Sequence, residues 1–336
     1  MTGAGPWRDE ARGMTPLPAG APSGGLGHVL LSSMRDEGPF ALEFVAHHRA
    51  IGFDRLFIAS NDCRDGTDVL LDALDAVGAI THHRSVPGPG DKPQHRAYAA
   101  MRALHGLDRA DWLMVLDADE FLHVSTGAGR VQDLTAAAPP GTDIIALNAR
   151  SFGTTPDPRW HRGLVTEQFT LRLRARHPLN GPVKSLARDI GRFQDIHNHS
   201  MVRYGGKAPL QVMRGDGSLF FIPPDRSIWD FLRNVLPRHI HHDLAHYNHY
   251  AIKSLSSFCL RQDRGRGAAP LAEPNQRHTD RYFDGFAAAD QRDLRFVRRY
   301  GAALRAEYDR LLALPGVAAA QAEAERRYGA LIKALL

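Results

Sequence analysis

The sequence is short of cysteine and lysine, and it has no long hydrophobic run. Only two cysteines, Cys63 and Cys259, occur in 336 residues. Such a distant pair does not make a disulfide framework, which argues against a small secreted scaffold and favours a reducing compartment. No apolar run reaches the roughly 18 residues that a membrane-spanning helix needs. Residues 1–26 are rich in Gly, Pro and Ala and lack the apolar core of a signal peptide. We therefore expect a flexible leader there, no transmembrane segment and a cytoplasmic protein.

Several common motifs are also absent. No Gly-x-Gly-x-x-Gly or Walker-type loop follows the first predicted strand, which excludes most dinucleotide enzymes and P-loop NTPases. Gly-x-Ser-x-Gly is absent, so a hydrolase nucleophile elbow is not supported. The net charge of +5 comes almost entirely from arginine, but it is spread along the chain. This distribution suits a phosphate-bearing ligand and does not predict nucleic-acid binding.

What is present is a regular alternation of strand and helix patterns. Short apolar runs are followed by amphipathic segments, which indicates βαβ units and a mostly parallel sheet with helices on both faces. The predicted strands are residues 28–34, 54–60, 79–86, 112–116 and 143–148, and the predicted helices are residues 39–50, 67–77 and 94–105. Residues 150–250 read as shorter strands and loops. From residue 290 the pattern is helical.

The fourth strand ends at two carboxylates, Asp117 and Asp119, separated by one residue. In open α/β sheets, ligands bind outside the carboxyl ends of the strands. Two hard oxygen ligands at that edge would hold a divalent cation, and the cation would hold a diphosphate. Alone, Asp-x-Asp is a weak signal because most instances are turn residues or helix caps.

Further motifs give the Asp-x-Asp pair a context. In order along the chain they are Met34-Arg35-Asp36-Glu37-Gly38-Pro39, Ile58-Ala59-Ser60-Asn61-Asp62-Cys63-Arg64-Asp65-Gly66-Thr67, Leu116-Asp117-Ala118-Asp119-Glu120-Phe121, Ser151-Phe152-Gly153-Thr154-Thr155, Pro182-Val183-Lys184-Ser185 and Asn248-His249-Tyr250-Ala251-Ile252-Lys253-Ser254. Together they resemble the family-2-like glycosyltransferases that shade into family 92. The resemblance covers roughly residues 27–265.

The resemblance implies a Rossmann-like GT-A fold with a mostly parallel central sheet, an irregular acceptor-side region and C-terminal helices. It divides the chain into a leader (1–26), a glycosyltransferase domain (27–265) and a helical extension (266–336). Within the domain, residues 27–125 would form the nucleotide-binding half and residues 126–265 the acceptor half.

The resemblance also assigns residues to the donor site. It implies that Mn²⁺ or Mg²⁺ is held by Asp117, Asp119 and a late ligand, His249, which a borderline cation tolerates among oxygens. The nucleotide would contact Arg35, Asp36, Glu37, Asn61, Asp62 and Lys253. Lys184 is a further candidate for a phosphate contact, and Glu120 could support the metal or the acceptor. For Asp65 we favour a turn-and-cap role, because Asx side chains serve in both.

The implied reaction is transfer of a sugar from a UDP-linked donor to a hydroxyl of a carbohydrate or glycoconjugate, in the manner of a hexosyltransferase. The family resemblance, rather than any spacing, suggests inversion at the anomeric carbon. An inverting displacement needs a carboxylate to take the acceptor proton, and Glu167 and Asp195 are candidates by residue type alone.

Other interpretations stay open. A non-catalytic nucleotide-sugar-binding protein would share these motifs, and a sugar-nucleotide pyrophosphorylase would share the fold but normally carries a Gly-rich loop after the first strand. His242, His246 and His249 would share one face if their segment were helical, which would permit a zinc site.

The C-terminal helical pattern carries an apolar stripe through Val297, Tyr300, Leu304, Tyr308 and Leu311, flanked by arginines. Packing of this stripe onto the domain is favoured. The alternative is peripheral contact with the inner face of a membrane through this basic helix.

Overall fold

The computed structural model describes residues 25–265, 267–270, 273 and 276–335. The predicted leader therefore lies almost entirely outside the described residues. Within them, no helix combines the length and apolarity that crossing a bilayer would need.

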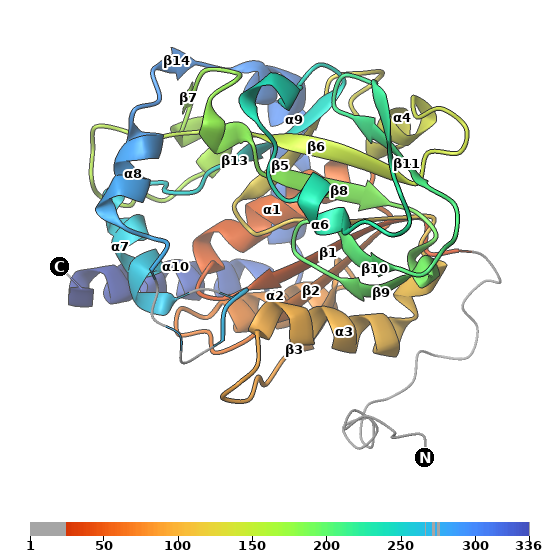
Figure 1. Cartoon of the computed structure of the whole chain (residues 1–336). Coiled ribbons are helices and arrows are strands. Elements are labelled where there is room, and N and C mark those ends of the chain that lie inside the picture. The colour runs from red at the N-terminus through yellow and green to blue at the C-terminus, as the bar shows by residue number, and fades with distance from the viewer. Residues whose placement is uncertain (1–24, 266, 271–272, 274–275, 336) are drawn as a thin grey trace.

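One ten-stranded sheet runs through the middle of the molecule (Figure 1). Its main path has the order β12-β11-β6-β8-β4-β1-β2-β3, and β13 and β5 extend from β6. The strands are β1 (His28–Met34), β2 (Arg55–Ser60), β3 (Thr81–Arg84), β4 (Trp112–Val115), β5 (Glu120–Val124), β6 (Ile144–Ser151), β8 (Val183–Ala187), β11 (Leu210–Arg214), β12 (Leu219–Ile222) and β13 (Ala245–His249).

The pairing is mostly parallel. β1 pairs in parallel with β2 and β4, β2 with β3, and β6 with β11 and β13. β8 is antiparallel to both of its neighbours, β4 and β6. This mostly parallel α/β sheet confirms the predicted GT-A-like fold class, although β3 is shorter than the predicted strand and β6 is longer.

The order of the strands creates a switch point. The chain builds β1, β2 and β3 outward on one side and then returns to place β4 against the other side of β1. The loops after β1 and β4 therefore leave the sheet next to each other and diverge. In open α/β sheets the crevice at such a point is where ligands bind.

Helices cover both faces of the sheet, as the alternation predicts. Buried residues of α1 (Gly38–Ala50) and α2 (Thr67–Ala76) form one core with Leu30 and Ile58. On the other face, Tyr98 and Met101 of α3 (Pro93–His105) form a second core with Leu31. Because side chains alternate along a strand, neighbouring β1 residues serve opposite cores.

The middle of the chain consists of short elements, as predicted. The helices are α4 (Val131–Ala136), α5 (Val165–Gln168) and α6 (Ile228–Leu232), and two small sheets join β7 (Leu171–Arg172) to β14 (Gln291–Arg292) and β9 (Phe193–Ile196) to β10 (Met201–Tyr204). The helical reading of the late histidines is wrong: His246 and His249 lie on β13, while His242 precedes it. Inter-strand pairing of β13 with β5 and β6 overrides the helical spacing.

Four helices of the described chain follow β13 and the loop after it. They are α7 (Leu255–Arg264), α8 (Asp280–Ala287), α9 (Arg295–Leu312) and α10 (Val317–Leu335), which ends the described chain. Tyr300, Leu304 and Leu311 of α9 are buried in the same core as α1, so most of the apolar stripe is covered by the domain, as favoured. Phe296 is buried in place of Val297. The boundary at residue 265 and the membrane contact stay predictions.

The hydroxyl of Tyr300 links α9 to the end of β5 by hydrogen bonds, so removing it tests this packing. The hydroxyl accepts from the Val124 backbone N–H at 2.9 Å and lies within hydrogen-bonding distance of the Val124 and Gly129 carbonyls. We expect Tyr300→Phe to lower the free energy of unfolding by about 1–3 kcal/mol, because buried backbone groups lose their partner. Urea denaturation measures the loss. Tyr308→Phe, which removes a half-buried hydroxyl two turns later on α9, should cost clearly less, and equal losses would contradict the assigned role.

Candidate active site

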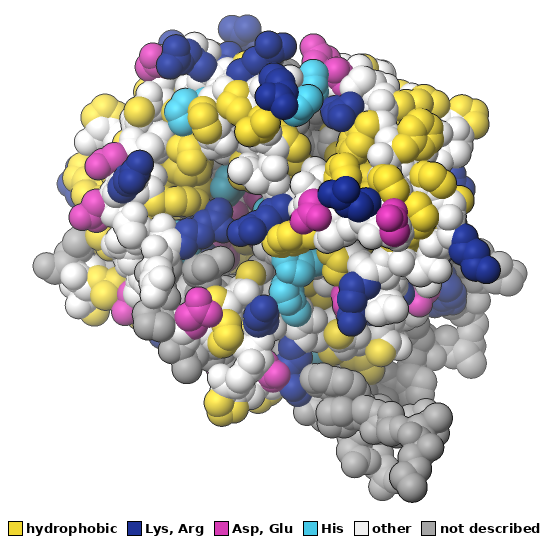
Figure 2. Space-filling model, in the orientation of Figure 1, with side chains coloured by type: hydrophobic (Ala, Val, Ile, Leu, Met, Phe, Trp, Pro, Cys, Tyr) yellow, Lys and Arg dark blue, Asp and Glu magenta, His cyan; other side chains and the backbone are white. Residues whose placement is uncertain are grey.

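A pocket opens at the switch point between β1 and β4. Its empty volume is about 730 Å³, open mouth included, which is a usual size for a small-molecule site. Residues from the loops after β1, β2 and β4 line it together with residues of α3, α7 and the segment that follows α7. Its charged lining residues are Arg35, Glu37, Asp117, Asp119, Arg261, Arg264 and Arg277. Figure 2 shows Lys and Arg side chains gathered around a hollow near the centre of this face.

The loop after β1 contributes Arg35 and Glu37 to the pocket. Arg35 lines it, and its buried Nε has no hydrogen-bond partner among the described residues. Glu37 is buried and forms ion pairs with Arg264 and with Lys253, whose Nζ lies 3.3 Å from its carboxylate. Burial would raise the pKa of Glu37, but Arg264 and Lys253 hold it below its usual value.

Asp36 has a supporting role in the same loop. Its backbone is left-handed, with φ 49°, and its carboxylate accepts from the Arg64 backbone N–H at 2.7 Å and from Arg64 Nε at 3.0 Å. It does not line the main pocket. Asp36 therefore joins the loops after β1 and β2 and shapes the pocket indirectly.

Of the polar residues after β2, only Asn61 lines the pocket. The exposed Asp62 accepts a hydrogen bond from Asn61 at 2.9 Å. Asp65 accepts from the backbone N–H groups of Gly38 at 2.7 Å and Thr67 at 2.9 Å, beside the first turns of α1 and α2. This confirms the turn-and-cap role predicted for Asp65.

Both aspartates of the Asp-x-Asp motif reach the pocket, because β4 ends at Val115 and the chain turns sharply before β5. Asp117 accepts hydrogen bonds from Lys184 and Gln94, each at 2.9 Å. Burial would raise its pKa, but Lys184 holds it below the usual value. Lys184 is itself buried and lies 2.8 Å from Glu120. It thus neutralises carboxylates beneath the pocket and is not among the lining residues.

The structure brings Asp119 and His249 together, and it adds Glu120. One ligand atom from each of these three buried residues lies within 4.8 Å of the other two. Asp119 and His249 are 3.7 Å apart, and burial lowers the pKa of His249 to about 4, so the imidazole is neutral and can bind a metal. Two carboxylates and one imidazole fit Mn²⁺. Asp117 lines the pocket with Asp119 but lies outside this group of three, and Glu120 and His249 are not among the lining residues.

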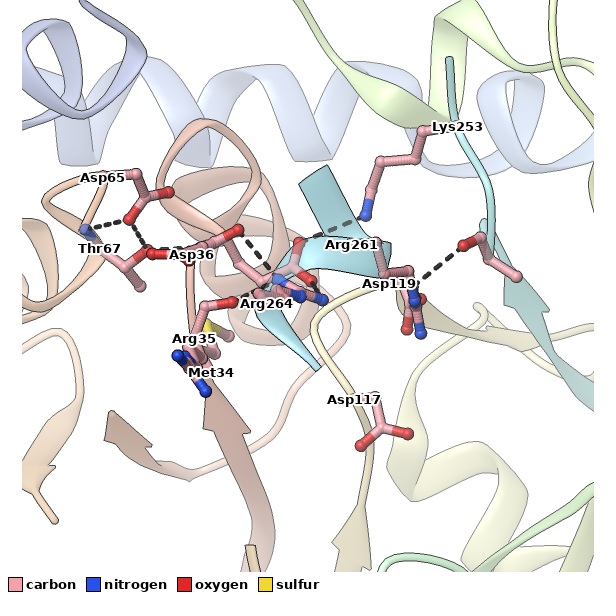
Figure 3. A network of polar contacts seen from close by, with 12 residues as sticks. Met34, Arg35, Asp36, Asp65, Thr67, Asp117, Asp119, Lys253, Arg261 and Arg264 are labelled. Carbon is pink, nitrogen blue, oxygen red and sulfur yellow. Dashed lines mark hydrogen bonds and ion pairs between the residues drawn. The ribbon is translucent and has the colours of Figure 1, made fainter. Parts of the chain in front are cut away.

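Two arginines outside the sequence motifs complete the pocket. Arg261 pairs with Asp119, and Arg264 pairs with Glu37. Figure 3 shows both arginines between the loop after β1 and the Asp119 loop. They come from α7, and the hydroxyl of its N-cap residue, Ser254, accepts a hydrogen bond from the Ser257 N–H at 3.3 Å. The sequence hints at this pair only through its i, i+3 spacing, which puts both arginines on one face of the helix that follows the last motif.

The two candidate bases lie elsewhere. Glu167 is on α5 and pairs with Arg305 of α9. Asp195 is on β9 and pairs with the exposed Arg203. Neither lines the pocket at the switch point. Burial raises the pKa of the Cys63 thiol to about 12, which does not suit a nucleophile.

The fold and site define a class: an α/β protein with a GT-A-like sheet and an acidic, arginine-rich pocket at its switch point. Comparison by sequence points to the same class. The chain is 30% identical over 127 residues to a glycosyltransferase family 92 protein of Ricinus communis, covering 37% of this chain and 22% of that protein. It is 24% identical over 203 residues to a family 92 protein of Oryza sativa subsp. japonica, covering 60% and 33%.

These similarities confirm the resemblance to family 92 and support a glycosyltransferase. The chain spans about a fifth to a third of the length of these relatives. No protein-family model matches it.

Solved structures show weaker likeness. TarS residues 1–349 of S. aureus in complex with UDP-GlcNAc aligns with a TM-score of 0.35 and 10% identity, covering 92% of this chain and 91% of that one. The mannosyltransferase PcManGT from Pyrobaculum calidifontis, in complex with GDP-Man and Mn²⁺, gives 0.34 and 12%, covering 96% and 78%. The fold assignment rests on the sheet topology described above.

Proposed function

We propose that this chain is a metal-dependent glycosyltransferase that moves a sugar from a nucleoside-diphosphate donor, UDP-linked, to a hydroxyl of a carbohydrate or glycoconjugate. One observation carries the proposal. The pocket at the switch point places the Asp-x-Asp carboxylates opposite several arginines, so a cation and a diphosphate would each find groups of opposite charge. Arg35 would contact the nucleotide with its guanidinium, whose buried Nε has no hydrogen-bond partner among the described residues.

The pocket and the buried residues beside it would each have a task in this reaction. Asp119, Glu120 and His249 would hold Mn²⁺ or Mg²⁺, with Asp117 beside them. The bound cation would supply Lewis-acid stabilisation of the leaving diphosphate. Arg261 and Arg264 would orient the phosphates. The bond between the anomeric carbon and the phosphate oxygen breaks as the acceptor oxygen bonds to that carbon from the opposite face, with inversion. The acceptor proton passes to a general base.

A thermal-shift experiment tests donor binding directly. UDP with Mn²⁺ should raise the melting temperature clearly more than either does alone, because a ligand that binds only the folded state stabilises it. Asp119→Ala should lose the additional shift. If the mutant keeps the whole shift, the metal assignment is wrong. Binding of UDP and Mn²⁺ without any turnover of UDP-sugars would instead favour the nucleotide-sugar-binding alternative.

A further inference from the structure

Arg261 and His249 both face the same oxygen of Asp119, a predicted metal ligand. Arg261 Nη1 donates to Asp119 Oδ2, and His249 Nε2 lies 3.7 Å from the same oxygen. The Asp119 side chain is only 2% exposed, so it cannot swing into solvent to serve two cations separately. A divalent cation that binds Oδ2 therefore meets a guanidinium already in its way.

The carboxylates of the site already have cationic partners without any added ion. The carboxylates are those of the buried Glu37, Asp119 and Glu120 and the half-buried Asp117, and the cations that contact them are Lys184, Lys253, Arg261 and Arg264. A divalent cation would thus bring surplus positive charge into a buried site. Like charges repel strongly at such short range, so the surplus is relieved only if an anion enters or a cation moves.

Arg261 is the cation best placed to move. It lines the pocket and its side chain is 18% exposed, whereas the Lys184 side chain is 1% exposed and lies between two carboxylates. It also donates to two neutral acceptors, the Ala251 carbonyl at 3.0 Å and His278 Nε2 at 3.3 Å. A diphosphate in the pocket would offer it a replacement for Asp119.

From this geometry we infer that Arg261 is a positioning residue that competes with the divalent cation for Asp119 and transfers to the donor diphosphate when the cation binds. The inference rests on the proposed function and deepens it. It makes the binding of the cation and the binding of the nucleotide depend on each other. The cation displaces Arg261 from Asp119, and the diphosphate then accepts hydrogen bonds from the displaced guanidinium. By linkage, each ligand then raises the affinity of the other by the same factor.

The test is a titration of Mn²⁺ without nucleotide, followed by the paramagnetic resonance signal of free Mn²⁺. Arg261→Gln should bind Mn²⁺ at least about tenfold more tightly than the wild type, because the competitor for Asp119 is gone. Arg172→Gln is the matched control: its side chain is 17% exposed and pairs with a buried aspartate, Asp293, outside the pocket. Its Mn²⁺ affinity should stay within about twofold of the wild type.

A second variant covers the possibility that Arg261→Gln does not fold. Arg261→Lys keeps the charge but loses the planar fork, so its Mn²⁺ affinity should rise by a smaller factor. Unchanged or weaker Mn²⁺ binding in both folded variants, with the wild type still binding Mn²⁺ in the presence of UDP, overturns the inference alone. A wild type that binds no Mn²⁺ even with UDP overturns the proposed function as well.

Discussion

Asp119→Asn is expected to lower kcat/KM for sugar transfer by at least about a thousandfold, since a cation contributes several kcal/mol to stabilising a leaving group and each 1.4 kcal/mol is about tenfold in rate. The amide keeps the shape of the side chain but removes its charge. It can no longer hold the cation beside His249 or pair with Arg261. Steady-state kinetics with a UDP-sugar and Mn²⁺ measure the loss.

Asp293→Asn is the matched control for this experiment. Asp293 is also a buried aspartate that pairs with arginines, Arg150 at 3.3 Å and Arg172 at 2.9 Å, but it lies outside the pocket. Both substitutions should destabilise the protein, because each leaves a buried or half-buried guanidinium without its counter-charge. Only Asp119→Asn should also abolish Mn²⁺-dependent turnover. Comparable losses of kcat/KM in the two folded variants would show that the effect of Asp119 is structural.

Lys184→Met is expected to have the largest effect on stability, lowering the free energy of unfolding by about 3–5 kcal/mol, because breaking a buried pair leaves charges without compensation. The Nζ of Lys184 lies 2.9 Å from Asp117 and 2.8 Å from Glu120, and its side chain is 1% exposed. Urea denaturation followed by circular dichroism measures the loss. Lys207→Met, at an exposed position, should change the same quantity by no more than about 0.5 kcal/mol.

The loss of stability in Lys184→Met should depend on pH. Burial and the neighbouring Asp117 and Asp119 raise the pKa of Glu120 to about 8, although Lys184 opposes them. In the unfolded chain the pKa of a glutamate is about 4.3, so the folded state holds the extra proton and its stability falls as pH rises from about 4.5 to 8. Without Lys184 the penalty should be larger at pH 8 than at pH 5. A loss that does not depend on pH would contradict this assignment of charge.

Some of the site could be read from the sequence because the signals are local. The apolar run before Asp117 indicated a buried strand, and its end fixed which edge of the sheet the two aspartates occupy. The alternation of strands and helices gave the parallel sheet, and motif order gave the family resemblance. The stripe on α9 was recognised for the same reason: helical periodicity shows which face is apolar.

Other features depend on contacts between distant parts of the chain. The pairing of Arg261 with Asp119 joins residues 142 positions apart, and that of Arg264 with Glu37 joins residues 227 apart. No local pattern encodes such contacts. The spacing of the late histidines leaves a helical face open, because spacing alone cannot detect that β13 completes a sheet with β5 and β6. Glu167 and Asp195 are candidate bases by residue type alone, and residue type does not show whether a carboxylate lies in the pocket.

The sequence by itself therefore determined the class of sheet, the edge at which Asp117 and Asp119 emerge, and the family that these motifs resemble. Each of these follows from hydrophobic periodicity and from short motifs, which are properties of neighbouring residues. Only the tertiary structure decided which charges meet. In the fold, Lys184 pairs with Asp117, Arg261 with Asp119 and Arg264 with Glu37. A buried carboxylate without a partner is costly, so each one pairs with a cation that the folded chain brings within reach.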